Sequence, residues 1–121
     1  MSQLNIKQGI SEQELEKAIT NKAFIQITKE ILSSEHPEYP YDSENYWNFT
    51  KINLRRYETF ETKIEVNETL KNMVAQSDKP LHFILLNEPW CSDGSFSQPV
   101  IKSIADWSNG SIQLHILLRD K

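Results

Sequence analysis

Apolar positions in the first third of the chain recur at helical spacing. Ser11 and Glu14 have the spacing of a capping box, and the apolar stripe after them predicts helix as far as about Leu32. One long helix and two helices with a break near Asn21 fit this pattern equally well. Pro37 ends the helical segment, because the residue before a proline is disfavoured in the helical conformation.

An aromatic stripe predicts the next helix. Asp42 or Ser43 can cap this helix, which runs to about Phe60. The stripe consists of Trp47, Thr50, Leu54 and Tyr57, and the residues that flank it are Tyr46, Phe49 and Phe60. Aromatic residues at this spacing are typical of a helix that docks on a core, and we favour that interpretation over a ligand-binding surface.

Strands and helices are predicted to alternate in the second half. The expected elements are a strand over 63–66, a helix over 68–76, a strand over 81–86, a helix over 96–107 and a strand over 111–118. In the first of these helices, Leu70, Met73 and Val74 are expected to face inward. The strand over 81–86 is apolar on both faces, which predicts a central strand that is covered on both sides.

This alternation predicts an α/β fold with three layers. A β-α-β-α-β order with short connections gives a parallel sheet with helices on its faces. Two or three helices precede that unit. The expected organisation is a helical N-terminal extension over residues 1–61, packed on a core over residues 62–121.

Length and charge exclude several classes of protein. A chain of 121 residues has the length of one domain. Its net charge of −4 argues against nucleic acid and against an anionic membrane as partner. A single cysteine cannot form an internal disulfide, and the N-terminus has no apolar signal segment. These features predict a protein of the reducing cytoplasm.

The single cysteine, Cys91, lies in the turn between the apolar strand 81–86 and the next helix. A helix N-terminus presents unpaired N–H groups and the positive end of the helix dipole, and both stabilise a thiolate. Asp93 is a candidate proton acceptor and a candidate N-cap, although its negative charge opposes thiolate formation. The pattern predicts a nucleophilic thiol at Cys91.

Several features of this half resemble the thioredoxin family. A buried strand is followed by Glu88-Pro89-Trp90-Cys91, and Pro99 comes eight residues after the cysteine. More narrowly, Trp-Cys-x-Asp, a Gln-x-Pro-Val-Ile helix and a closing strand that ends Leu-Leu-Arg-Asp resemble a bacterial branch with a helical N-terminal extension. The resemblance covers residues 43–121. It implies a thioredoxin-like fold with Cys91, Asp93 and Trp90 as catalytic residues, and with neither cofactor nor metal.

The chain departs from the family pattern at three places. Gly94 stands where the family has the second cysteine of Cys-x-x-Cys, and Leu85 stands where it has a buried acidic residue. The sequence ends at Lys121, before the family's cis-proline loop, β-hairpin and final helix. We therefore expect a thioredoxin-like fold that is incomplete at its C-terminal side.

These departures leave two functional hypotheses. In the first, Cys91 alone exchanges with a protein disulfide or a low-molecular-weight thiol, and an external thiol resolves the mixed disulfide. In the second, Cys91 is inert, and the chain is a non-catalytic binding or scaffold module that has kept the fold.

Two further expectations concern the predicted sheet. His82 and His115 fall on neighbouring strands, where hydrogen-bonded sheet histidines are favoured over a zinc site that needs three or four convergent ligands. The strand over 81–86 lacks the hairpin that would pair with its outer side. Its open edge predicts self-association or docking of a partner protein.

Overall fold

The computed structural model describes residues 11–63 and 67–119. Its elements are α1 (Glu12–Glu16), α2 (Asn21–Ser33), α3 (Glu44–Lys63), α4 (Glu68–Gln76), β1 (Leu81–Asn87), α5 (Ser92–Trp107) and β2 (Ile112–Leu118). The mixture of helices with a parallel sheet confirms the expected α/β class. None of the described helices is both long and apolar enough to cross a bilayer.

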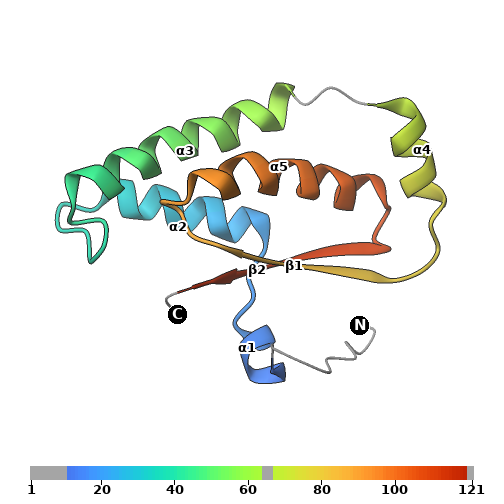
Figure 1. The fold of residues 1–121 in the computed structure, drawn as a ribbon, viewed down its shortest axis with the longest axis horizontal. Helices are drawn as coiled ribbons and strands as arrows, with labels where there is room; N and C mark the ends of the chain where they lie inside the picture. Colours follow the sequence, from blue (N-terminus) through green and yellow to red (C-terminus); the bar gives the residue numbers. More distant parts are fainter. Residues whose placement is uncertain (1–10, 64–66, 120–121) are drawn as a thin grey trace.

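The two strands pair in parallel over their whole length. The register runs from Leu81 opposite Ile112 to Asn87 opposite Leu118. Figure 1 shows α2, α3 and α5 on one side of the strands, α1 on the other, and α4 at the end of the sheet. The carboxyl end of β1 leads into α5, so the sheet and this helix together fix the turn that carries Cys91.

A small apolar core joins α2, α3 and β2. Phe24, Tyr57 and Ile116 are buried together, with less than 2% of each side chain exposed. The rings of Phe24 and Tyr57 meet edge to face, with centroids 5.5 Å apart and an interplanar angle of 70°. This cluster anchors the helical N-terminal part to the sheet.

The N-terminal segment forms two helices, which settles the alternative that the sequence left open. Thr20 caps α2 by accepting a hydrogen bond from the Ala23 amide through its side chain at 3.1 Å. Just before it, Ile19 forms an isolated antiparallel bridge with Ile116, with N···O distances of 2.8 and 3.0 Å. The break near Asn21 therefore lets the chain pair with the outer edge of β2.

The aromatic helix is confirmed and is longer than expected. It runs to Lys63, so the strand predicted over 63–66 is wrong at Lys63, and its remaining residues lie outside the described part of the chain. Thr50 and Tyr57 are buried as the stripe predicts, but Phe49 is exposed. The helical phase rotates Phe49 away from α2 and α5, the two helices on which α3 packs.

The inward positions predicted for α4 are wrong for two of three residues. Leu70 and Met73 are exposed, and only Val74 is half-buried. The physical reason is the position of α4 at the end of the sheet, where it packs against α5 (Figure 1). One neighbouring helix covers only a narrow part of its apolar face.

The prediction that the strand over 81–86 is covered on both sides is also wrong within the described residues. The side chain of Leu86 is 63% exposed and that of Leu81 is 49% exposed, whereas Asn87 is buried. The helices α2, α3 and α5 lie on the side toward which Asn87 points, and only the short α1 lies on the other (Figure 1). Leu81 faces the same side as Asn87 at the far end of the strand, so Leu86 is the residue that marks the open side. The strand therefore has more apolar side chains than the described helices cover.

Candidate functional site

Cys91 occupies the N-cap of α5. Its backbone is extended, with φ −79° and ψ 115°, and its side chain is half-buried and makes no capping hydrogen bond. The Cys91 amide donates to the Glu88 carbonyl at 2.9 Å, which closes the turn after β1. The thiol therefore lies beside the unpaired amides of the first helical turn, as the sequence predicts.

Asp93 is exposed in the first turn of α5. Because Cys91 holds the N-cap, Asp93 does not cap the helix, and one of the two roles considered for it is excluded. A carboxylate in this turn stabilises the helix through its dipole. Trp90, Cys91 and Asp93 thus share one turn, but only the first two contact the body of the protein closely.

Trp90 packs beside the thiol against α3 and the C-terminal strand. Its ring meets that of Tyr46 edge to face at 5.3 Å, and the guanidinium of Arg119 lies 5.9 Å from its centroid. The indole Nε1 is buried and has no hydrogen-bond partner among the described residues. This arrangement holds the indole against the protein next to Cys91.

A second set of contacts ties the turn to α3. The buried amide of Asn53 donates to the Pro89 carbonyl at 3.1 Å. Arg56 donates to Asn53 at 3.2 Å and to the Ser95 hydroxyl at 3.3 Å, and Ser95 in turn donates to the Ser92 carbonyl at 2.6 Å. Residues on both sides of Cys91 are therefore held by one helix.

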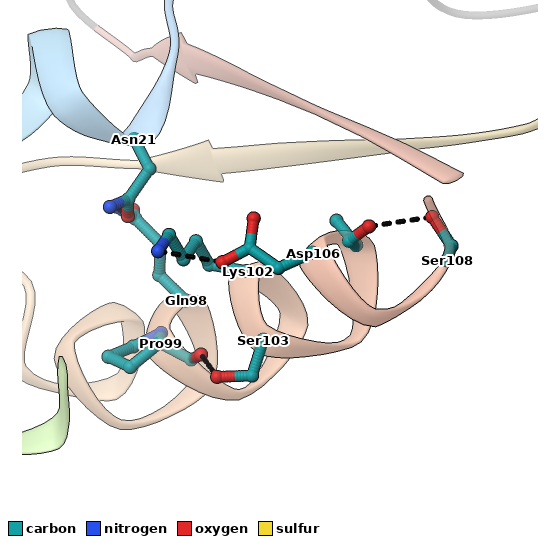
Figure 2. Close-up of polar contacts among 8 residues, drawn as sticks. Asn21, Gln98, Pro99, Lys102, Ser103, Asp106 and Ser108 are labelled. Atoms are coloured by element: carbon teal, nitrogen blue, oxygen red, sulfur yellow. Dashed lines mark hydrogen bonds and ion pairs between the residues drawn. The ribbon is translucent and has the colours of Figure 1, made fainter. Parts of the chain in front are cut away.

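Asn87 is the centre of a buried polar network behind the turn. Its Nδ2 donates to the Tyr57 hydroxyl at 2.9 Å and to Gln98 Oε1 at 2.8 Å, while its Oδ1 accepts from the Glu88 amide at 2.9 Å. Gln98 continues the network to Asn21 at the start of α2, at 2.8 Å (Figure 2). Both donor hydrogens of the Asn87 amide are used, which is what a buried amide requires.

Burial raises the pKa of the Tyr57 phenol above its ordinary value of 10.0. The hydrogen bond from Asn87 acts in the opposite direction, and negative charge on the neighbouring Cys91 adds to the increase. The phenol therefore remains protonated at neutral pH, and its oxygen is a stable acceptor for Asn87.

Gly94 lies against this network at the position of the family's second cysteine. A Cβ atom built on Gly94 would overlap the Asn87 side chain at Oδ1, Cγ and Nδ2. Asn87 cannot move aside without breaking its bonds to Tyr57, Gln98 and Glu88. A side chain at Gly94 would therefore have to displace Asn87 from these bonds, so the packing disfavours a second thiol at this position.

The histidines predicted on neighbouring strands do form a hydrogen-bonded pair. His82 Nδ1 and His115 Nε2 are 2.9 Å apart, and the rings stack with centroids 5.1 Å apart. Burial lowers the pKa of His115, and the charge of His82 lowers it further. Among the described residues, no group of three or more His, Cys, Asp or Glu side chains converges in a way that could hold a metal ion.

The sequence predicted Trp90, Cys91 and Asp93 as site residues and placed Tyr57 on a packing stripe, but it did not predict the polar network around them. The members of this network are Asn21, Asn53, Tyr57, Asn87 and Gln98. They come from α2, α3, β1 and α5, and the first two of these helices are far from the turn in the chain. The one local signal was the amide of Asn87 at the end of an apolar strand.

The comparisons with known proteins agree with this geometry. The family model described as Thioredoxin matches residues 40–121, more than half of the chain. The match begins just before α3 and extends through the turn of Cys91 to the last strand. No curated protein and no solved structure matches the chain.

Proposed function

The chain belongs to the thioredoxin family, and on that premise we propose that it performs thiol–disulfide exchange with one thiol, that of Cys91. The observation that carries the proposal is the space at Gly94, which Asn87 fills. A two-cysteine mechanism requires a side chain at this position. A one-cysteine mechanism requires only an accessible thiol at the helix N-terminus, and the half-buried Cys91 supports it.

The exchange proceeds in two balanced steps. The thiolate of Cys91 attacks one sulfur of a substrate disulfide; a new S–S bond forms, the old one breaks, and the second substrate sulfur leaves as a thiolate. An external thiolate then attacks the substrate sulfur of the mixed disulfide; a new S–S bond joins the external thiol to the substrate, and Cys91 leaves as a thiolate. Asp93 is the candidate group to accept the thiol proton, and Trp90 limits the directions from which a disulfide can approach.

Three finer assignments belong to the same proposal. The chain fits the family branch with a Trp-Cys-x-Asp turn, in which residues 1–61 form a helical extension and residues 62–121 form the core. The packing of α2 and α3 on β2 and α5 supports an extension that is packed on the core, although α3 continues to Lys63, two residues past this boundary. A reduced, accessible thiol is suited to the cytoplasm, which we propose as its location.

The second candidate is a binding module without chemistry, and the edge of β1 favours it. Among the described residues β1 pairs only with β2, and Leu81 and Leu86 next to the open edge are exposed. The strand has no formally charged side chain, so two copies can pair edge to edge without repulsion. The occupant in this reading is a second copy of the chain. Light scattering that finds only monomer at tens of micromolar would exclude it.

The decisive experiment measures the reactivity of Cys91. The protein is mixed with glutathione disulfide, adducts are detected by mass spectrometry, and reduction of insulin by external thiol is followed with and without the protein. Cys91→Ser is the control. We expect a mixed disulfide and accelerated reduction with the wild type alone. Equal reduction by both proteins, or an unreactive thiol in the folded chain, would contradict the exchange and leave the binding module.

A further inference from the structure

A groove of about 510 Å³ opens beside the turn that carries Cys91. It lies between the second half of α2, the loop over 34–41 and the turn at Glu88 and Pro89. Ile27, Ile31 and Pro40 contribute apolar wall, and Tyr39 at the rim has a largely exposed ring. The volume is within the usual range of a ligand-binding cleft.

The exposed charges that line this groove are acidic. The carboxylates of Glu30 and Glu38 line it, together with His36 and with Glu88, which is buried and interacts within the protein. No lysine or arginine of the described residues is part of the lining. Arg119 lies over the Trp90 ring and lines an adjoining groove that shares Glu30, so Glu38 is the carboxylate of this lining that lies away from that cation. A cation is therefore attracted to the groove, and the exposed Tyr39 ring offers a face on which a guanidinium or ammonium can stack.

The groove and the thiol share one turn. Glu88 and Pro89 form part of the wall, and the carbonyl of Glu88 accepts from the Cys91 amide at 2.9 Å. An extended peptide that follows this turn out of the groove is led toward the thiol, because Glu88 and Pro89 are separated from Cys91 by Trp90 alone. A substrate segment bound in the groove would present its disulfide to Cys91.

We propose that this groove binds an extended peptide segment with a lysine or arginine residue, and that it selects basic disulfide substrates for Cys91. The inference rests on the proposed exchange function. The apolar wall and Tyr39 accommodate an extended chain, while the carboxylates of Glu30 and Glu38 provide the preference for a basic residue.

The test uses two synthetic peptides that differ in one side chain. Each has a cysteine blocked as a mixed disulfide with thionitrobenzoate and, three residues away, either arginine or glutamine. Release of the coloured thiolate gives the second-order rate at low salt. We expect the arginine peptide to react about two- to five-fold faster for each carboxylate engaged. The double variant Glu30→Gln/Glu38→Gln should bring the two rates together.

A charge-matched control separates the groove from the net charge of the protein. Glu58→Gln/Glu68→Gln removes two exposed carboxylates from α3 and α4, which do not line the groove. This control should keep the preference for arginine. An equal loss of preference in both double variants, or a preference that survives in the groove variant, would overturn the proposal.

The same peptides with serine in place of cysteine keep failure of the groove distinct from failure of the chemistry. Their binding to Cys91→Ser is measured by fluorescence anisotropy. If Cys91 is unreactive but the arginine peptide still binds more tightly, the exchange function fails and the groove stands. If Cys91 reacts with both peptides alike and neither binding nor rate depends on arginine, the groove fails and the exchange function stands.

Discussion

The two faces of β1 differ more than their sequence suggests. On the side toward α5, Asn87 is buried, and both donor hydrogens of its side-chain amide are bonded, one to Tyr57 and one to Gln98. On the other side, Leu86 is largely exposed and a pair of histidines lies across the two strands. One face thus combines close packing with satisfied polar groups, whereas the other is an apolar surface with little cover. An apolar strand composition indicates a need for burial but does not identify what supplies it.

The difference has a consequence for where the protein tolerates change. Groups on the helix side have no alternative partner, because each is surrounded by fixed neighbours. Groups on the open side can exchange their contacts for water. Substitutions on the helix side should therefore cost more stability than substitutions on the open side.

Removing the ring of Phe24 should cause the largest loss. Phe24 is fully buried against Tyr57, so Phe24→Ala should lower the free energy of unfolding by about 3–5 kcal/mol. The matched truncation on the open face, Leu86→Ala, should change it by less than about 0.5 kcal/mol. Urea unfolding followed by circular dichroism measures both. Similar losses would mean that the open face is covered in solution.

A methyl group at Gly94 tests the filled space behind Cys91. Gly94→Ala should destabilise the protein by about 1–3 kcal/mol, because the new Cβ displaces Asn87 from its hydrogen bonds. The destabilisation by Gly94→Ala should disappear in the Asn87→Ala background, because the competing amide is then absent. At position 94 alanine is also a better helix former than glycine. A double-mutant cycle gives the coupling energy. Additive effects would show that Asn87 and Gly94 do not compete for the same space.

The hydroxyl of Tyr57 should have a smaller effect. Tyr57→Phe removes one acceptor from Asn87 and leaves Gln98 as its remaining side-chain partner. We expect a loss of about 1 kcal/mol in the free energy of unfolding, with little change in the packing of the ring. Tyr46→Phe, which alters an exposed hydroxyl on the same helix, is the control and should be neutral.

The histidine pair should give the smallest effect, visible as a pH dependence. The pKa of His115 is lower in the folded chain than the ordinary 6.5, so the unfolded chain binds the proton more readily. The stability contributed by neutral His115 is complete above pH 6.5 and is lost as the pH falls below it. Melting temperatures between pH 7.5 and 5 should fall less steeply in His115→Gln. Parallel profiles would show that the pair does not titrate on unfolding.

The local elements of the fold were predictable because their signals are local. The cap at Ser11 and the apolar run before Cys91 each act within a few residues. The turn after α5 is equally local, because Asn109 and Gly110, whose residue types tolerate positive φ, both adopt it. The wrong inward positions, Leu70 and Met73, depend on which element lies opposite, and periodicity does not contain that information.

The candidate site also has a part that local sequence predicts and a part that depends on contacts between separate elements. Cys91 at a helix N-terminus follows from the order of strand and helix, which the sequence reveals. The competition between Asn87 and Gly94 does not, because it joins residues from two elements and depends on a third partner in α3, Tyr57. In the sequence, Gly94 stands where a second thiol is missing. Only the packing shows that the Asn87 side chain occupies the space that a side chain at this position would need.

The filled space at Gly94 also makes it hard for a turn with one cysteine to change into a turn with two. A single substitution that introduces a cysteine there meets the Asn87 amide, and a single substitution that removes the amide leaves Tyr57, Gln98 and the Glu88 amide each short of a bond. Both routes to a two-cysteine turn pass through a less stable protein. Selection that acts on one mutation at a time would therefore retain a single cysteine in the turn of proteins that have this network.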